Sequence, residues 1–464
     1  MTIQFFGAAR TVTGSKHLLT TADGTQILLD CGLFQGINTD ELNQQFGFNP
    51  AAVDYMVLSH AHIDHTGLLP RLVAQGYKGP IYTTSATIDL CEVMLMDSAR
   101  IQERDLERVN SRRSRRGQSE LGALYNEANV RQALSQMVAV SYNQPFDIGD
   151  SVTGLLTDAG HLLGSAAVSL TIREKNKTTQ LTFSGDIGRP NDKILRTHAP
   201  FPQADYIICE STYGDRLHEP EPDMMAHLLR IVQQTCVQKR GKLLIPAFAV
   251  DRTQELIYAL DQLVANGKLP SLPVYIDSPM SVKATQVMRD HEEDFNPDIL
   301  AYIKKDGDAF DFHNLHYVSD VEGSKAINGT EEPCIIIAPS GMAEAGRIKH
   351  HIKNNIEDPT TTILMVGYAS PNSLGGALKR GDKEVTIFGD RYSVKARVEI
   401  MDSFSAHGDY QEMLQFLSCQ NPAEVKTVFL VHGEYEKQLI WKEKLQAAGF
   451  DHVVIPDMQE KADL

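Results

Sequence analysis

Four potential metal ligands crowd into the segment 59–67, whose sequence is SHAHIDHTG. They are His60, His62, Asp64 and His65, and they follow an apolar run that is typical of a buried strand. Side chains two residues apart on an extended chain project to the same side, so His60 and His62 can reach one ion. Asp64 and His65 lie a turn further on and can serve a second ion. Imidazole nitrogens and carboxylate oxygens suit zinc, so the pattern predicts a catalytic metal site.

Three further residues, at other places in the sequence, could belong to the same metal site. Asp30 ends an expected hairpin, His161 lies in DAGHLLGS, and Asp186 lies in FSGDIG. Asp30 or His161 alone would be read as a capping or core residue. Their order together with the segment 59–67 resembles the metallo-β-lactamase superfamily. The resemblance implies that Asp30 supports the metal site from behind the ligands, that His161 completes the first zinc site, and that Asp186 bridges both ions.

Later motifs narrow the resemblance to the β-CASP nucleases of that superfamily. Three segments match in order: 208–214 (ICESTYG), 404–409 (FSAHGD) and 429–434 (FLVHGE). They contain Glu210, His407 and His432. Nearly two hundred residues separate the first motif from the second, as expected of the β-CASP cap inserted into the lactamase fold. The chain looks most similar to bacterial and archaeal relatives of the nuclease subunit that cleaves pre-messenger RNA at its 3′ end.

The resemblance implies a ribonuclease with two Zn²⁺ ions, for which Mn²⁺ is a possible substitute. Members that act on RNA carry histidine at the place of His432, whereas members that act on DNA carry an apolar residue. The implied catalytic residues are Asp30, Asp64, Glu210 and His407. One zinc would be held by His60, His62, His161 and Asp186, and the other by Asp64, His65, His432 and again Asp186.

Hydrolysis of a phosphodiester has three requirements. The attacking water must lose a proton near neutral pH, the negative charge that builds on the phosphate oxygens must be neutralised, and the departing sugar oxygen must receive a proton. The metal ions are expected to meet the first two needs. His407 is the candidate general acid, with Glu210 as its partner, because a nearby carboxylate favours the imidazolium. This assignment rests mainly on the resemblance. Attack of water at phosphorus leaves a 5′-phosphate and a 3′-hydroxyl.

The cap is expected to hold the phosphate backbone. The candidate residues are Arg252, Ser340, Gly341 and Arg347. The segments 338–342 (APSGM) and 246–255 (PAFAVDRTQE) each follow a predicted strand and precede a predicted helix. Backbone N–H groups at a helix N-terminus can bind phosphate, and an arginine can clamp it. An ordinary capped helix explains both segments equally well.

Two positions depart from the family pattern. Asp251 stands before Arg252 where glycine is common, and its charge would repel a close phosphate. Gly376, in SLGG, occupies a position that is often arginine. Both put the details of RNA binding in doubt, and neither affects the metal site.

Strands alternating with helices must position these groups, which indicates an α/β protein. The fold expected from the resemblance is the αββα sandwich of the metallo-β-lactamases with an inserted α/β cap. Expected domain bounds are 1–209 and 395–464 for the two parts of the lactamase domain and 210–394 for the cap. The main strands are expected at 17–21, 26–30, 55–58, 166–172, 180–184, 206–210, 242–246, 273–277, 334–338, 362–366, 425–431 and 452–455. Helices are expected at about 84–110, 252–264, 281–290, 345–355 and 434–447.

Composition indicates the setting of the protein. The 464 residues include no apolar run long enough for a membrane span and no secretory signal, and six cysteines show no paired spacing, so a cytoplasmic protein is expected. A formal net charge of −16 argues weakly against nucleic-acid binding. The basic run 112–116 (RRSRR) is either a solvated loop or a grip on a nucleic-acid backbone.

Single-stranded RNA is the expected partner, and a homodimer stays open. Three other functions also stay open: a DNA nuclease of the same fold, a small-molecule metallohydrolase such as a thioesterase, and an inactive scaffold. The cap and its motifs argue against a small substrate. The complete ligand set argues against a scaffold, because inactive family members lose ligands.

Overall fold

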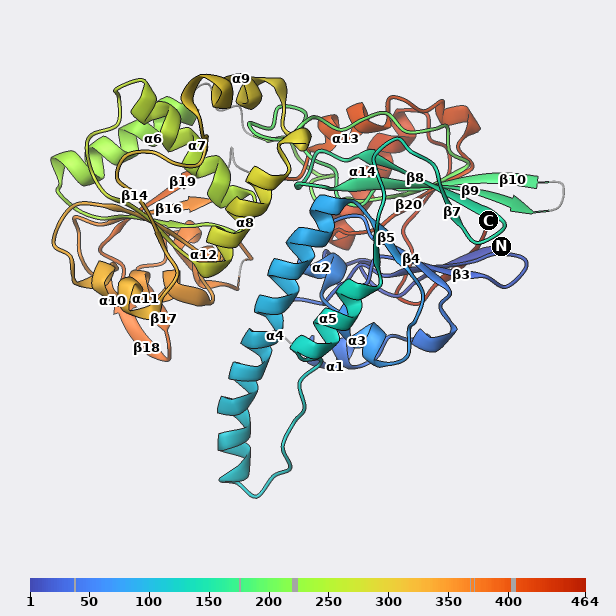
Figure 1. Cartoon of the computed structure of the whole chain (residues 1–464), viewed down its shortest axis with the longest axis horizontal. Coiled ribbons are helices and arrows are strands. Elements are labelled where there is room, and N and C mark those ends of the chain that lie inside the picture. Colours follow the sequence, from blue (N-terminus) through green and yellow to red (C-terminus); the bar gives the residue numbers. More distant parts are fainter. Residues whose placement is uncertain (37–38, 175–176, 219–223, 368, 371, 402–405) are drawn as a thin grey trace. The chain divides into compact units, whose positions relative to one another are not determined.

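The computed structural model describes residues 1–36, 39–174, 177–218, 224–367, 369–370, 372–401 and 406–464. The chain divides into two compact units (Figure 1). Unit one comprises residues 1–217 and 407–464, and unit two comprises residues 218–406. The domain bounds expected after residues 209 and 394 remain predictions, and the compact units divide the chain somewhat later.

Unit one contains two seven-stranded sheets. The first has the order β22 (Lys461–Asp463), β1 (Thr2–Phe5), β2 (His17–Thr20), β3 (Gln26–Leu29), β4 (Tyr55–Val57), β5 (Ile81–Thr83) and β6 (Met137–Ala139). The second has the order β21 (Val453–Val454), β20 (Thr427–Leu430), β11 (Tyr206–Cys209), β10 (Lys177–Phe183), β9 (Ala166–Glu174), β8 (Val152–Asp158) and β7 (Phe146–Ile148). The expected hairpin is β2–β3, and its turn uses Gly24 at φ +91° and a bond from the Thr25 amide to Asp23.

The core of unit one lies between these sheets. Apolar side chains alternate along the strands, and those of both sheets meet in one buried cluster that includes Leu29 and Val57 from the first sheet and Val168 and Phe183 from the second. A second cluster joins the other face of the second sheet to α13 (Tyr410–Leu417) and α14 (Tyr435–Ala447) through residues such as Trp441. Beside the first sheet, α4 (Ser85–Ser114) contacts β6 and α5 (Glu127–Ser135), which packs on α3 (Leu69–Ala74). This arrangement is the expected αββα sandwich.

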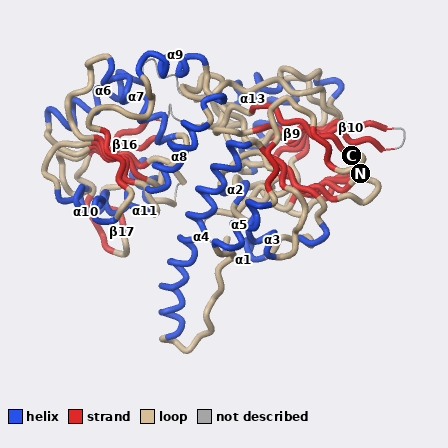
Figure 2. Tube along the Cα trace, viewed as in Figure 1, coloured by secondary structure: helices blue, strands red, loops and turns tan. Residues whose placement is uncertain are grey.

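Unit two is built on a six-stranded sheet whose neighbouring strands are all parallel. Its order is β14 (Leu315–Val318), β13 (Val274–Asp277), β15 (Ile335–Ala338), β12 (Leu243–Pro246), β16 (Thr362–Val366) and β19 (Arg397–Met401). Its inner strands β13, β15, β12 and β16 are largely buried and rich in Ile, Leu and Val, as expected of strands covered on both faces, whereas the edge strands β14 and β19 are partly exposed. Figure 2 shows the strands of each unit gathered inside, with the helices around them.

The helices of unit two follow the α/β pattern. The longer ones are α6 (Met224–Val232), α7 (Arg252–Ala265), α8 (Pro279–Asp290), α9 (Pro297–Asp306), α10 (Val321–Gly329), α11 (Gly346–Asn355) and α12 (Leu374–Arg380). One buried cluster packs α11 and α12 against the sheet through Ile348, Ile352 and Leu378. A two-stranded hairpin joins β17 (Glu384–Ile387) to β18 (Asp390–Ser393).

Most elements expected from periodicity are present, with ends that differ by a few residues. The largest difference is in α4, which continues to Ser114 and so includes Arg112 and Arg113 of the basic run. The terminal strands β1 and β22, which pair with each other at one edge of the first sheet, were not expected from the sequence. No helix in the described part of the chain is long and apolar enough to cross a membrane.

Candidate metal centre

The candidate ligands lie at one end of the strands of unit one. Asp30 directly follows β3, His60 follows β4 after two residues, and Glu210 follows β11. The remaining members of the site also come directly after strands or in the loops that follow them: His161 after β8, Asp186 after β10 and His432 after β20. Parallel neighbours end at the same sheet edge, which brings groups that are far apart in the sequence together.

Asp30 orients two of the histidines. It is fully buried, at φ +58°, and its carboxylate accepts hydrogen bonds from the Ser59 amide at 2.7 Å and from the Ser59 hydroxyl at 2.7 Å. The same carboxylate lies 2.6 Å from Nδ1 of His65. An Nδ1–H donated to a carboxylate leaves Nε2 as the ligand atom of His65, so Asp30 selects the tautomer that can bind metal.

Ser59 extends this support to the next residue. Its hydroxyl lies 3.0 Å from Nδ1 of His60. Because the hydroxyl donates its proton to Asp30, it can accept the Nδ1–H of His60, which leaves Nε2 of that ring with its lone pair. Sequence reasoning missed Ser59; the signal available was a hydroxyl residue directly before the first ligand histidine.

Three histidine nitrogens and one carboxylate form the first ligand set. His60 Nε2 lies 3.1 Å and His161 Nε2 lies 3.2 Å from Nδ1 of His62. Oδ2 of Asp186 lies 3.4 Å from Nε2 of both His60 and His161. One ligand atom from each of the four residues lies within 4.8 Å of the others, so a single cation can reach all four.

A second set lies beside the first and shares Asp186. It contains Asp64, His65 and His432, and Nε2 of His432 lies 3.4 Å from Oδ2 of Asp64. Oδ1 of Asp186 lies 3.2 Å from Nε2 of His65 and 3.6 Å from Nδ1 of His432. Thr212, another residue that sequence reasoning missed, places its hydroxyl 3.0 Å from Nδ1 of His432. The two oxygens of Asp186 therefore face different ligand sets.

The chemistry of these groups fits divalent cations. Nε2 of His65 and Oδ1 of Asp186 are buried and meet hydrogen-bond geometry with no described residue. Such orphaned polar atoms are costly unless another partner binds them. Burial lowers the pKa of His60 to about 3 and that of His62 to about 4, so both imidazoles are neutral ligands at neutral pH. The structure therefore has a site for divalent metal.

Asp186 and His65 differ from these neutral rings. Burial raises the pKa of Asp186, but the charges of His432 and His65 outweigh it and hold the pKa well below its ordinary value. Burial lowers the pKa of His65, but the charges of Asp186 and Asp30 raise it well above its ordinary value. A metal ion that binds here displaces the proton from His65, which links metal binding to pH.

Glu210 and His407 form a pair next to the ligands. Glu210 is fully buried, and Oε1 accepts the Ile187 amide at 2.7 Å and lies 3.1 Å from Nδ1 of His407. Burial lowers the pKa of His407, but the charges of Glu210 and Asp186 outweigh it and raise the pKa to about 9. Nε2 of His407 lies 3.9 Å from Oδ2 of Asp186. The imidazolium therefore stands beside the metal ligands with its second N–H on their side.

A close backbone approach places His407. Its backbone pairs with that of Gly188, and the Gly408 amide donates to the Ile187 carbonyl at 2.8 Å. A Cβ on Gly188 would lie 1.7 Å from the carbonyl oxygen of Gly160, so a side chain does not fit there. Phe404 and Ser405 of the same motif lie outside the described residues.

The four expected phosphate-binding residues lie in unit two. Arg252 is buried and contacts Glu255, with Asp251 at 3.7 Å. Arg347 donates to Asp277 at 2.6 Å and to the Ser319 carbonyl at 2.7 Å. Both guanidinium groups are thus engaged by acceptors of their own unit, which leaves them less able to clamp a phosphate than the sequence indicated.

Ser340 and Gly341 lie before the helix that contains Arg347 rather than in its first turn. The helix α11 begins at Gly346, and the intervening residues form a turn in which the Ala343 amide donates to the Ser340 carbonyl at 2.9 Å. Gly341 lies against the ring of Phe248, whose nearest atom would be 2.9 Å from an added Cβ. The Ile348 amide of α11 donates to the Pro339 carbonyl at 3.3 Å, so the start of α11 lies against this segment, and phosphate binding by Ser340 and Gly341 remains a prediction.

The two departures from the family pattern both lie at the starts of helices. Asp251 has φ +69° and precedes α7 without a side-chain capping bond. Gly376 is buried in the first turn of α12, where its amide donates to the Ser373 hydroxyl at 3.0 Å.

Family models match three parts of the chain. Residues 18–203 match the "Metallo-beta-lactamase superfamily domain", residues 253–378 the "Beta-Casp domain" and residues 391–456 the "Zn-dependent metallo-hydrolase RNA specificity domain". The last match includes His407 and His432.

Whole-chain relatives agree with these matches. Ribonuclease TTHA0252 of Thermus thermophilus is 35% identical over 449 residues, which cover 97% of each chain. Transcription termination factor FttA of Methanocaldococcus jannaschii is 30% identical, over 94% of this chain and 67% of that protein. A crystal structure of a protein of unknown function from Enterococcus faecalis V583 has the same fold, with a TM-score of 0.55 at 12% identity over 100% of this chain and 99% of that one.

Proposed function

This chain belongs to the β-CASP group of the metallo-β-lactamase superfamily, and on that premise we propose that it is a metal-dependent ribonuclease that hydrolyses RNA phosphodiester bonds. The observation that carries the proposal is the sharing of Asp186 between two ligand sets, one with three histidines and one with Asp64, His65 and His432. A bridging carboxylate between two such sets is the arrangement that two adjacent cations need.

The proposed cofactors are two Zn²⁺ ions, with Mn²⁺ as a substitute. Nitrogen-rich sets with one or two carboxylate oxygens favour zinc over magnesium or calcium, which prefer oxygen ligands throughout. When bound, the ions would lower the pKa of water to about 7 and neutralise charge that builds on the phosphate oxygens.

The chain's own groups prepare this site. Asp30 and Ser59 hold the rings of His60 and His65 with their ligand nitrogens inward, so that little reorganisation is needed on metal binding. His407 carries a proton at neutral pH and can donate it from Nε2 to the departing sugar oxygen. Glu210 accepts the Nδ1–H of the same ring and keeps it oriented.

Several observations support RNA as the substrate. Residues 391–456 match the family model of an RNA specificity domain, and the Thermus thermophilus relative, which aligns over 97% of each chain, is called a ribonuclease. His432 is the residue type that family members acting on RNA have at this position of the motif, and it also belongs to the second ligand set. We expect single-stranded RNA, with 5′-phosphate and 3′-hydroxyl products. A cytoplasmic location and a homodimer stay predictions.

The test combines metal analysis with product mapping. The purified protein should contain about two zinc ions per chain, and chelation should abolish cleavage of RNA labelled separately at each end. His407→Ala should lower turnover by about 10²–10⁴-fold without loss of zinc. His313→Ala, which changes an exposed histidine of unit two, is the matched control and should change neither.

Several results would contradict the proposal. Cleavage that survives complete chelation would remove the metal mechanism. A cyclic 2′,3′-phosphate product would show attack by the ribose hydroxyl rather than by water. Preferential cleavage of a DNA strand of matched sequence would indicate a DNA nuclease of the same fold, and zinc loss in His407→Ala would make that residue a ligand rather than the acid.

A further inference from the structure

The helix α4 forms an arm that begins at the metal centre. The side chains of Thr84, directly before the helix, and Thr87, in its first turn, both donate to the Gly164 carbonyl, at 2.7 and 2.9 Å. Gly164 lies in the same loop as the ligand His161. From there α4 continues for 30 residues, which corresponds to about 45 Å. Within unit one its far end extends beyond the body of the sandwich (Figure 1).

The returning chain braces the far half of the arm. Asn110 bonds the backbone of Leu121 in both directions, with its Nδ2 donating to the carbonyl and its Oδ1 accepting from the amide, each at 2.9 Å. Nε of Arg113 donates to the Ser119 carbonyl at 2.7 Å. The arm is therefore a braced extension of the fold rather than a single unsupported helix.

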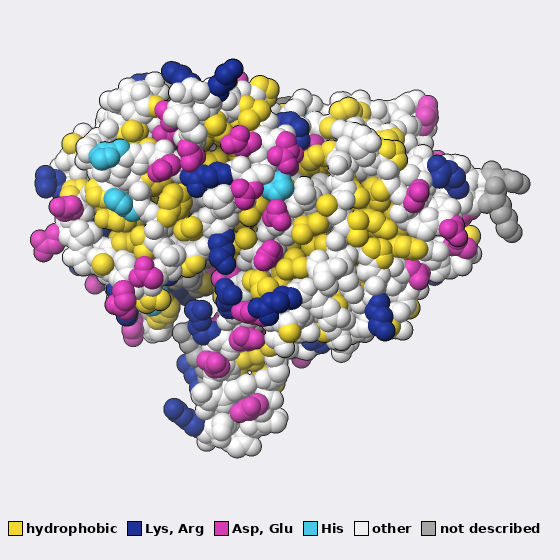
Figure 3. All heavy atoms as spheres, viewed as in Figure 1, with side chains coloured by type: hydrophobic (Ala, Val, Ile, Leu, Met, Phe, Trp, Pro, Cys, Tyr) yellow, Lys and Arg dark blue, Asp and Glu magenta, His cyan; other side chains and the backbone are white. Residues whose placement is uncertain are grey.

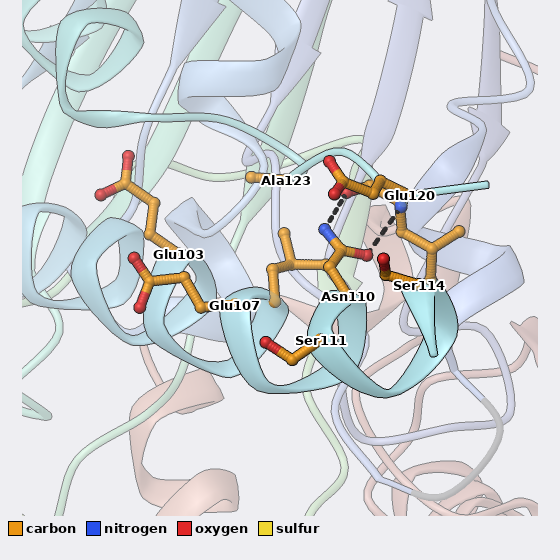
Figure 4. Close-up of a pocket in the computed structure, with 9 residues that line it drawn as sticks. Glu103, Glu107, Asn110, Ser111, Ser114, Glu120 and Ala123 are labelled. Carbon is orange, nitrogen blue, oxygen red and sulfur yellow. Dashed lines mark hydrogen bonds between the residues drawn. The ribbon is translucent and has the colours of Figure 1, made fainter. Parts of the chain in front are cut away.

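One side of this arm is an acidic groove. It lies between α4 and the returning chain, and Figure 4 shows the carboxylates of Glu103 and Glu107 side by side along the helix, with Glu120 on the opposite wall. A phosphate strand would be repelled from this side.

The neighbouring side of the helix is basic. Arg104, Arg112 and Arg115 stand at positions i, i+8 and i+11, so they fall within an arc of about 80°. Arg116 follows at the tip. All four side chains are exposed, and within the described ranges none of them forms an ion pair. These four residues are called the basic stripe below.

The stripe contrasts with the rest of the protein. Residues 100–126 contain seven arginines and four carboxylates, a local charge of +3, in a chain whose formal net charge is −16. On the face shown in Figure 3, basic and acidic side chains both appear along the arm. A local excess of exposed arginine on an acidic protein is the pattern expected of a phosphate-binding surface.

We propose that the basic stripe binds the phosphate backbone of the RNA substrate about one length of α4 away from the metal centre. The proposal rests on the proposed function, and it adds a distal contact that holds long RNAs. RNA is favoured over an acidic protein because the helix that carries the stripe is anchored in the loop of a metal ligand. The acidic groove directs the strand to the stripe.

The experiment compares a short and a long RNA. A stacked strand rises about 3.4 Å per nucleotide, so an RNA of about six nucleotides cannot span the ~45 Å arm, whereas one of about forty can. The variant R112A/R115A/R116A should raise KM for the long RNA by about 10-fold or more at low salt and leave the short RNA unchanged. Its logarithmic salt dependence should become shallower by about 2, since each lost contact with single-stranded RNA contributes about 0.7.

Two control variants test whether the effect depends on where the positive charges lie and on the charge itself. K78A/R173A/K461A removes three exposed positive charges of unit one outside the arm and should leave KM for both RNAs unchanged. R112K/R115K/R116K keeps the charges and should retain most of the affinity, because lysine binds phosphate as a point charge. Arg113 stays in every variant because it braces the arm.

The inference fails if the alanine variant cleaves and binds the long RNA like the wild type, or if it impairs the short RNA equally. An acidic protein that binds the stripe while RNA does not would also overturn it. Fluorescence anisotropy of the long RNA with His407→Ala as the background measures binding without cleavage. Stripe-dependent binding with no cleavage by the wild type would overturn the proposed function alone and leave the distal contact standing.

Discussion

The pair formed by Glu210 and His407 allows a prediction about pH dependence. Glu210→Gln keeps the size of the side chain and removes the charge that lies 3.1 Å from Nδ1 of His407. The pKa of His407 is raised from 6.5 to about 9, which corresponds to about 3 kcal/mol in favour of the imidazolium. The folded-state pKa is raised, so the protonated form is present at neutral pH and is lost as the pH rises through about 9.

The magnitude follows from the two protonation states. With a pKa near 9, about nine tenths of the enzyme carries protonated His407 at pH 8, whereas with a pKa of 6.5 only about 3% does. Glu210→Gln should therefore lower kcat/KM by up to about 30-fold at pH 8 and by less than about 2-fold at pH 6. The thirty-fold loss is worked for a pKa that returns to 6.5 in the variant, where Asp186 still raises the pKa and burial still lowers it.

The assay is the pH profile of kcat/KM for a labelled RNA, with zinc content measured on the same samples. Bound cations move the alkaline limb of both proteins to lower pH, so the difference between wild type and variant is the quantity to compare. The limb of the variant should lie at lower pH. An unmoved limb, or an equal loss at pH 6 and pH 8 with full zinc content, would refute the role of His407 as a proton donor.

Other predictions concern the supports of the site and of unit two. Asp186→Asn should reduce metal content toward none and cleavage to background while circular dichroism stays native, because one carboxylate serves both ligand sets; retention of two zinc ions would contradict the bridging role. Ser59→Ala should weaken metal affinity by about 10–100-fold, measured by competition with a chelating dye, because its hydroxyl links a carboxylate to a ligand histidine. Asp277→Asn, in unit two, should lower the free energy of unfolding by about 3–5 kcal/mol in urea denaturation, because the buried carboxylate that holds the partly exposed Arg347 guanidinium loses its charge, with zinc content unchanged.

Local pattern was sufficient for part of the candidate ligand set. The segment 59–67 places four candidate ligands within six residues after a strand, whereas His161, Asp186 and His432 were selected through the resemblance of their contexts to a known family. Apolar runs also located four of the six strands of the parallel sheet of unit two, because strands buried on both faces read as continuous apolar runs, whereas the partly exposed edge strands β14 and β19 were not expected. Elements such as β1 and β22 were missed because their pairing joins the two ends of the chain, which no local window contains.

The phosphate-binding residues expected in the cap could not be assessed from the sequence. Arg252 and Arg347 were selected as phosphate ligands because each lies in or next to a segment that runs from a predicted strand into a predicted helix, where helix amides and an arginine can bind phosphate. Only the fold shows that Arg347 is bound by Asp277, seventy residues earlier, and that Arg252 lies against Glu255 one turn later. Whether a guanidinium is free to bind phosphate depends on which acceptors lie near it in space, and these cannot be identified from spacing along the chain.

The amino-acid sequence by itself determined the kinds of candidate ligand and their order, and the resemblance of the motifs to a known family implied the chemistry. Tertiary structure decided how they act together: which nitrogen of each ring faces inward, that the two oxygens of Asp186 serve different sets, and that Ser59 and Thr212 support the ligands. These properties depend on distances of a few ångströms between strands that are far apart in the chain. Chain folding, rather than residue type, creates those distances.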